Sequence, residues 1–230
     1  MSFLTAPLPS RLPSRLRRPG QFRGRVRATS AGAATELLED RVLSAAAGLG
    51  AAALLPPPPW SDGRESVRAA LETSLAELLS SPSVAAAELQ GTWELVYTSR
   101  GTAVTRALPQ LPLSLPQPTV SGVLQSLAAE GAGYTTTNVA TVGLGLLGTW
   151  SLRAAGTWTP LGQGVPTPDA RVAFNAFSFE LVDQQILQPL TLQVPEVLRQ
   201  AATFRTLWLG GKLRVAEGAA SGNRFVFRRV

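Results

Sequence analysis

Residues 171–182 read RVAFNAFSFELV, and the spacing of their apolar side chains decides the fold. Val172 and Phe174 share one parity, whereas the apolar residues at 177, 179 and 181 share the other. Successive side chains of a strand point to opposite faces, so the apolar face changes near Asn175 and Ala176. A bulge or sharp bend there would keep both sets facing inward, as the strands of curved barrels require.

Segments on both sides of this stretch also have strand patterns. Residues 91–97 alternate, with Trp93, Leu95 and Tyr97 on one face. Further strands are expected at Thr119–Leu127, Tyr134–Val142 and Thr149–Trp158, where Gly156 suggests a bulge or bend. The C-terminal patterns are Phe204–Leu209, a Gly210-Gly211 turn, Lys212–Ala216, a turn at Gly218–Asn223, and Arg224–Arg229 with Phe225 and Phe227 on one face. Strands joined by turns without helices between them indicate an antiparallel barrel or sandwich.

A helical prefix is expected ahead of the strands, over residues 29–82. A first helix is predicted from Thr35 to Leu54, and a proline run at 56–59 separates it from a second helix. The second helix shows apolar residues at three- and four-residue steps, namely Val67, Leu71, Leu75, Leu78 and Leu79. We expect these two helices to pack without chemistry of their own. Residues 83–230 are then the antiparallel β-barrel domain.

The uncharged run Val42–Leu55 raises the question of a membrane segment. As a helix its 14 residues span about 21 Å, short of the ~30 Å hydrocarbon core of a bilayer. A thylakoid-lumen signal is a second interpretation, but Glu36, Glu39 and Asp40 directly before the run argue against it. A soluble helix is preferred, and no transmembrane helix is expected.

The N-terminal segment carries most of the excess positive charge. The chain has 21 Lys and Arg against 15 Asp and Glu, and residues 1–27 hold seven of the arginines and no acid. The remainder, residues 28–230, therefore has 14 basic residues against 15 acids, a near-neutral body that argues against nucleic-acid binding. Residues 1–28 have the basic, proline-interrupted composition of a disordered plastid transit peptide, with a disordered basic tail as the alternative.

The sequence lacks two residue types on which many catalytic sites depend, while its scattered carboxylates leave a two-carboxylate hydrolase open, with no particular pair favoured. The sequence has no histidine and no cysteine, which excludes Ser-His-Asp triads, Cys-His dyads and most zinc sites. Gly143–Gly148 matches G-x-G-x-x-G, but a dinucleotide site needs a helix next, and the following residues are strand-like. A glycine-rich turn is the preferred interpretation. We predict a protein that is not an enzyme and has no cofactor and no metal site; an enzyme of the barrel class is the least favoured hypothesis.

Two sequence blocks resemble a known family. Leu89-Gln90-Gly91-Thr92-Trp93-Glu94-Leu95-Val96-Tyr97-Thr98-Ser99 is similar to the L-x-G-x-W-x-L-[LV]-Y-T-S block of the plastid lipid-associated proteins, or fibrillins. Leu213-Arg214-Val215-Ala216-Glu217-Gly218, followed by Gly222-Asn223-Arg224-Phe225-Val226-Phe227, resembles the closing block of that family. The residues that carry the family motif are Gly91, Trp93, Tyr97, Arg214, Gly218 and Phe225. Gly210-Gly211-Lys212 departs from the family, which has an acidic D-x-D before the closing block.

The resemblance implies a lipocalin-like barrel in the chloroplast, at plastoglobules, at the thylakoid surface or in the stroma. It implies a structural or carrier protein that binds apolar molecules such as lipids, carotenoids or quinones and associates peripherally with lipid surfaces. Aromatic residues and one leucine supply candidate ligand contacts in the barrel interior: Trp93, Leu95, Tyr97, Trp150, Trp158, Phe174, Phe177 and Phe179. The alternative hypothesis is a plastid scaffold that binds a protein partner, with a filled barrel and no small-molecule ligand.

Overall fold

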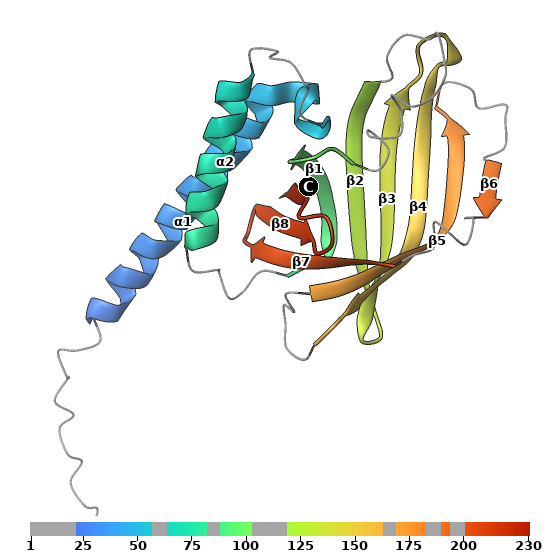
Figure 1. Ribbon diagram of the computed structural model, residues 1–230. Coiled ribbons are helices and arrows are strands. Elements are labelled where there is room, and N and C mark those ends of the chain that lie inside the picture. Colours follow the sequence, from blue (N-terminus) through green and yellow to red (C-terminus); the bar gives the residue numbers. More distant parts are fainter. Residues whose placement is uncertain are drawn as a thin grey trace, which may run out of the picture.

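A pair of helices packs beside an antiparallel β-sheet in the computed structural model of the chain (Figure 1). The structure describes residues 22–56, 64–81, 88–102, 119–162, 169–182, 190–193 and 201–230. The first 21 residues of the expected leader, the prolines at 57–59 and the proline-interrupted segment at 109–118 lie outside the described residues. The secondary structure is mainly strand, as the sequence patterns predicted.

The helical part consists of α1 (Phe22–Leu49), the 3-10 helix η1 (Gly50–Leu54) and α2 (Glu65–Ser80). α1 begins at Phe22, earlier than the expected start at Thr35, so residues 22–28 are helical rather than unstructured. No proline occurs between Pro19 and Pro56, and the segment is rich in arginine and alanine, which favour helix. Gly50, with a φ of 55°, ends α1 in the left-handed conformation that glycine tolerates best.

All strand pairings described are antiparallel. The strands are β1 (Gly91–Thr98), β2 (Thr119–Glu130), β3 (Gly133–Gly143), β4 (Thr149–Pro160), β5 (Asp169–Leu181), β6 (Leu190–Gln193), β7 (Ala202–Leu209), β8 (Leu213–Gly218) and β9 (Arg224–Arg229). Their order in the sheet is β4-β3-β2-β1-β9-β8-β7-β5-β6, and β4 also pairs with β5. The pairings therefore run from β4 through seven further strands back to β4. Only β6 has no counterpart among the predicted strands.

The predicted irregularity in residues 171–182 is present as a β-bulge. Ala176 of β5 pairs with Ala155, and Phe174 pairs with Gly156, so Asn175 has no partner residue on β4. The prediction of a bulge near Asn175 and Ala176 is confirmed. Gly156 is required opposite it, because a Cβ atom there would lie 2.0 Å from the carbonyl oxygen of Ala173.

A second bulge lies in β1 and corrects one prediction. Leu95 pairs with Phe227 and Tyr97 with Val226, so β1 has one extra residue, Val96, between these two pairs. The extra residue reverses the alternation. Tyr97 therefore does not share a face with Trp93 and Leu95, as predicted, but points to the opposite face of the sheet, toward α2.

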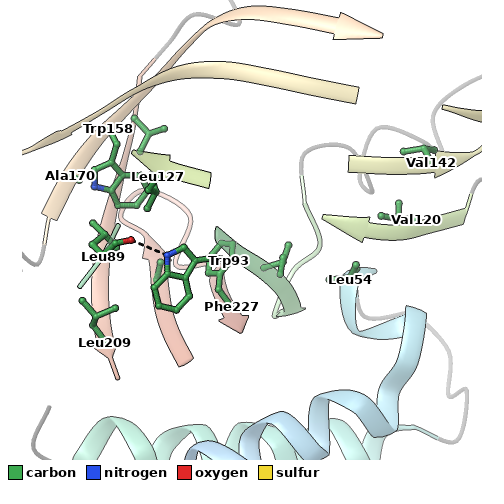
Figure 2. Close-up of a cluster of buried hydrophobic side chains, with 13 residues drawn as sticks. Leu54, Leu89, Trp93, Val120, Leu127, Val142, Trp158, Ala170, Leu209 and Phe227 are labelled. Atoms are coloured by element: carbon green, nitrogen blue, oxygen red, sulfur yellow. Dashed lines mark hydrogen bonds between the residues drawn. The ribbon is translucent and has the colours of Figure 1, made fainter. Parts of the chain in front are cut away.

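The two faces of the sheet hold separate hydrophobic clusters. The aromatic cluster comprises Leu54, Leu89, Trp93, Leu95, Val120, Leu127, Val142, Trp158, Ala170, Val172, Leu209, Ala216 and Phe227, and Figure 2 draws these residues. The helix-side cluster comprises Val42, Ala46, Leu49, Ala53, Leu71, Leu75, Leu78, Tyr97, Trp208, Leu213, Val215 and Val226. The first defines what we call the aromatic face of the sheet, and the second joins the other face to α1 and α2. The predicted role of the helices in packing is confirmed.

Candidate apolar binding site

The aromatic face brings together side chains from several strands. Trp158 of β4 stacks on Phe204 of β7 with ring centroids 6.1 Å apart, and Phe204 meets Phe225 of β9 at 5.6 Å. Phe174 and Phe177, on the two sides of the Asn175 bulge, have ring centroids 6.2 Å apart. The bulge keeps both of these phenylalanines on the same face, as the parity of the segment required.

Burial on this face changes along β4 and β5. Trp158 and its partner Val172 are 3% and 2% exposed, at one end of the two strands. Toward the other end, Phe174, Phe177 and Phe179 are only partly buried. Trp150 and Leu152 lie on the same face by alternation along β4 and are also partly buried. The aromatic side chains of β4 and β5 are therefore buried at the Trp158 end and partly buried toward Trp150, whose partner Val142 on β3 is itself buried.

Trp93 lies fully buried at the packed Trp158 end of the aromatic face. Its ring N–H donates a hydrogen bond of 2.9 Å to the carbonyl oxygen of Leu89, as Figure 2 shows. The Arg229 guanidinium lies 4.6 Å from the centre of the Trp93 ring and donates to the carbonyl oxygen of Glu88. A fully buried indole with a satisfied N–H and a cation on its ring is held in one position.

Arg214 is the only charged residue among the fully buried ones described, and it lies in this packed end. Its guanidinium is 4.2 Å from the centre of the Phe227 ring, 5.2 Å from that of Trp93 and 5.5 Å from that of Trp158. One terminal nitrogen, Nη2, donates to Oε1 of Gln125, and Nε2 of Gln125 in turn donates to Oδ1 of Asn138 at 3.0 Å. Burial lowers the pKa of Arg214 to about 9.

The predicted ligand-contacting residues fall into two groups. Trp93, Leu95 and Trp158 belong to the aromatic cluster, and Phe174 packs against it. Phe177 contacts Phe174, while Trp150 and Phe179 lie on the same face by their register. Tyr97 is separated from them, because its hydroxyl donates to Glu72 of α2 and its ring lies 5.5 Å from the Arg68 guanidinium.

The two motif blocks are neighbours in space and are joined by Asn223. The Asn223 side-chain oxygen accepts hydrogen bonds from the Thr98 hydroxyl at 3.0 Å, from the Ser99 hydroxyl at 3.1 Å and from the Arg100 amide at 2.9 Å. Its amide nitrogen donates to the carbonyl oxygen of Gly101 at 2.8 Å. Of the motif residues, Gly91 begins β1 with a φ of 136°, Gly218 ends β8, and Phe225 packs against the aromatic cluster.

The departure at Gly210-Gly211-Lys212 contacts α1. A Cβ atom at Gly210 would lie 1.8 Å from Oε1 of Glu39, which is itself 3% exposed and accepts a 3.4 Å hydrogen bond from the Trp208 indole. Lys212 pairs with Glu36 at 2.9 Å and with Asp40 at 3.0 Å. Acids of α1 thus lie beside this turn, and the missing side chain at 210 makes room for Glu39.

The polar residues Gln125 and Asn138 were not predicted as part of the site. Gln125 shares a face of β2 with Val123 and Leu127, which pack in or against the aromatic cluster, yet it is 6% exposed. A polar residue that alternates in step with apolar residues was the signal that could have identified Gln125. Arg214 was named only as a motif residue, because its neighbours Leu213 and Val215 gave no indication of which face it takes.

The glycine-rich segment Gly143–Gly148 is a tight connection between β3 and β4. A three-residue 3-10 turn, η3 (Gly145–Leu147), is closed by a 2.9 Å hydrogen bond from the Leu144 amide to the Gly148 carbonyl oxygen. A strand follows it, as expected, so the segment lacks the helix N-terminus of a dinucleotide site. Leu146 at its tip is 93% exposed.

A groove of about 290 Å³ lies between α1 and η1 on one side and β1, β2 and β9 on the other, and Leu54, Leu95 and Val120 of the aromatic cluster are part of its lining. Leucine and alanine side chains of the helices form most of one wall, and the opposite wall includes Glu94 and Arg228, which pair with each other. Within the described ranges, no three acidic side chains are grouped so that they could hold a metal ion.

Neither helix of the described part of the chain combines the length and the apolar character needed to cross a membrane. Comparison of the chain with models of known protein families and with curated proteins finds no match.

Proposed function

We propose that this chain is a non-enzymatic, fibrillin-like protein of the chloroplast, whose sheet forms a lipocalin-like barrel that binds apolar molecules such as lipids, carotenoids or quinones. The observation that carries the proposal is the aromatic face, whose side chains are buried at its Trp158 end and only partly buried along β4 and β5 toward Trp150. A concave apolar surface of aromatic side chains, closed at one end, is the usual lining of a small-molecule site.

Two observations support the barrel. The order of pairing leads from β4 through the other strands to β5 and, by the additional pairing, back to β4. In addition, the Arg214 side chain of β8 touches side chains of β1, β2, β4 and β9, namely Trp93, Gln125, Trp158 and Phe227. β8 and β4 are not neighbours in the sheet, so their side chains can share one buried contact only where the sheet curves around it.

The energetics suit a neutral, apolar ligand. Burying about 400 Å² of apolar surface, at about 25 cal/mol per Å², contributes on the order of 10 kcal/mol. Losses of translational, rotational and side-chain freedom subtract from that gain, which still allows micromolar affinity without an ionic contact. The aromatic rings of Trp150, Phe177 and Phe179 lie in the partly buried part of the aromatic face and would contact such a ligand.

Peripheral association with plastoglobules or thylakoids is supported by the Trp150 end of the sheet. Leu146, at the tip of the β3–β4 connection, and Val182, directly after β5, are 93% and 51% exposed at this end. Exposed apolar side chains beside a cavity entrance can dip into a lipid surface and lower the barrier to ligand transfer. The basic, acid-free leader supports delivery to the plastid.

A partner-binding scaffold is the second candidate, and one observation favours it. Trp93, Arg214 and Phe227 pack against one another at the packed end. If the packing continues to the Trp150 end in solution, the interior has no room for a ligand, and the accessible surfaces would serve a protein partner instead.

Tryptophan fluorescence distinguishes the two candidates. We expect a plastid quinone or carotenoid to quench the protein's fluorescence saturably, at low and at high salt alike, because apolar contacts are not screened. Phe177→Ala and Leu152→Ala should weaken binding, since both side chains lie on the aromatic face. Leu124→Ala, on the opposite face of β2 and 40% exposed, is the matched control and should bind normally. If no apolar ligand quenches saturably and none copurifies, the scaffold takes the place of the carrier.

A further inference from the structure

The Arg214 guanidinium is a buried charge without a counter-ion. The side chain is fully buried, and no Asp or Glu of the described residues pairs with it. Only Nη2 has a hydrogen-bond partner; Nε and Nη1 are buried and have none. Burying an unpaired charge is costly, and buried cations in proteins are normally paired with an acid.

The surroundings hold the guanidinium in place without neutralising it. Three aromatic rings contact it, and the Gln125 side chain fixes one terminal nitrogen. The chain of bonds from Arg214 to Gln125 and on to Asn138 is neutral beyond the arginine. Thr136, on the same face of β3 as Asn138, adds a third buried polar atom with no partner, its Oγ1. Donors are thus arranged in an otherwise apolar interior, and the acceptor that would match them is an anion.

We propose that Arg214 binds the carboxylate of a long-chain fatty acid or a similar acyl carboxylate, whose chain runs along β4 and β5 toward Phe177 and Phe179. This inference rests on the proposed function, because it requires that the interior admits a ligand. Arginine suits the role because its planar fork can donate two parallel hydrogen bonds to a carboxylate.

The dimensions of the aromatic face suit an extended chain. Gly156, opposite Thr136 in the β3–β4 pairing, is six residues from Trp150 along β4. At about 3.3 Å per residue this is about 20 Å of strand, the length scale of an extended acyl chain. The head of the ligand would lie at the packed end beside Trp93 and Trp158, and its tail at the Trp150 end.

The test compares oleate with oleyl alcohol, which has the same chain and a neutral head, on the full chain below the micelle concentration. We expect oleate to bind at least about tenfold more tightly than the alcohol, because a buried charge-assisted pair replaces an unpaired cation. Arg214→Met should reduce that ratio to about one and leave the alcohol affinity within about threefold, since the apolar contacts persist. Arg214→Lys, which keeps the charge but loses the fork, should fall between the two.

Arg153→Met is the matched control, because Arg153 is exposed on the opposite face of β4 and should keep the full preference for oleate. Equal affinities for oleate and the alcohol in the unaltered protein would overturn the carboxylate site and leave the apolar carrier standing. If neither binds although a quinone or carotenoid does, the carboxylate site falls alone; if no apolar ligand binds, the proposed function falls with it.

A second measurement needs no variant. The carboxyl carbon of ¹³C-labelled oleate reports its ionisation by NMR, and a carboxylate beside Arg214 should stay ionised to a lower pH than in an uncharged site. A bound carboxyl that protonates at a higher pH than the free acid would show an apolar environment without the arginine and would overturn the inference.

Discussion

At the scale of single residues, Asn175 and Gly156 shape the β4–β5 pair together. The extra residue at 175 shifts the alternation of β5, and the missing side chain at 156 lets the two strands approach where the bulge kinks. Without this pair, either Phe174 or the set Phe177 and Phe179 would point away from the aromatic face. The number of aromatic side chains on the aromatic face therefore depends on Asn175 and Gly156, neither of which has an apolar side chain.

Substitution of Gly156 tests this dependence. Gly156→Ala should lower the free energy of unfolding by about 1–3 kcal/mol, as overpacking of a filled position does, because the new Cβ meets a backbone carbonyl that cannot move alone. Chemical denaturation measures the change. Gly122→Ala, next to the bulge of β2 where no atom lies within 4 Å of a Cβ, is the control and should be neutral or stabilising by up to about 1 kcal/mol. Equal losses in both variants would show that the close approach at Gly156 is not limiting.

At the scale of elements, the β3–β4 connection combines a tight backbone with an exposed apolar tip. The glycines allow the turn, since Gly145 and Gly148 have φ values of 59° and 79°. Leu144 packs against the aromatic cluster, while Leu146 points into solvent. An element built in this way places one large apolar side chain beyond the Trp150 end of the sheet, where a lipid surface would first be met.

A charge at this tip should weaken association with lipid. Leu146→Asp is expected to reduce cosedimentation with plastid-lipid vesicles several-fold, because a carboxylate resists entry into the acyl boundary. Leu161→Asp is the matched control, since Leu161 is 53% exposed at the other end of β4 and should not touch the same surface. Equal binding of both variants and the unaltered protein would contradict a role for the tip.

At the scale of the whole molecule, the helices and the sheet are joined by apolar packing and by one buried acid. Glu39 of α1 accepts a hydrogen bond from Trp208 of β7, and its carboxylate occupies the space that a side chain at Gly210 would need. Burial raises the pKa of the Glu39 carboxyl, more than the hydrogen bond from Trp208 lowers it. The folded state therefore holds a proton on Glu39 more tightly than the unfolded chain does.

This linkage predicts how stability depends on pH. From about the ordinary pKa of 4.5 upward, the unfolded chain loses the Glu39 proton before the folded state does, so the contribution of Glu39 to stability falls as pH rises through that window. Glu39→Gln, which keeps an oxygen for Trp208, should raise the melting temperature at pH 7 and have little effect at pH 4. A variant that is less stable than the unaltered protein at pH 7 would show that the ionised carboxylate is a favourable part of the helix–sheet contact.

Local sequence patterns determined most of the strands and one of the two bulges described above. Some features can be recognised within a few residues, because the alternation of side chains is a property of the extended backbone itself. They include the change of parity at Asn175, the glycine at 156 in β4, and the alternating Phe225 and Phe227. The helical spacing of Leu71, Leu75 and Leu78 is likewise local, and it correctly identified the buried side of α2. The sequence also removed histidine and cysteine chemistry outright, since neither residue occurs.

Tertiary structure decided the features that join distant parts of the chain. Val96 and Tyr97 are both apolar enough for either face, so only the pairing with Val226 determined that Tyr97 points to α2. Arg214 lies between two apolar residues, and only the contacts between strands that are distant in sequence place it beside Trp93 of β1 and Trp158 of β4. Gly210 is needed because Glu39, far away in sequence, occupies the space of its missing side chain. Contacts of this kind depend on which surfaces meet after folding, a condition that no short stretch of sequence contains.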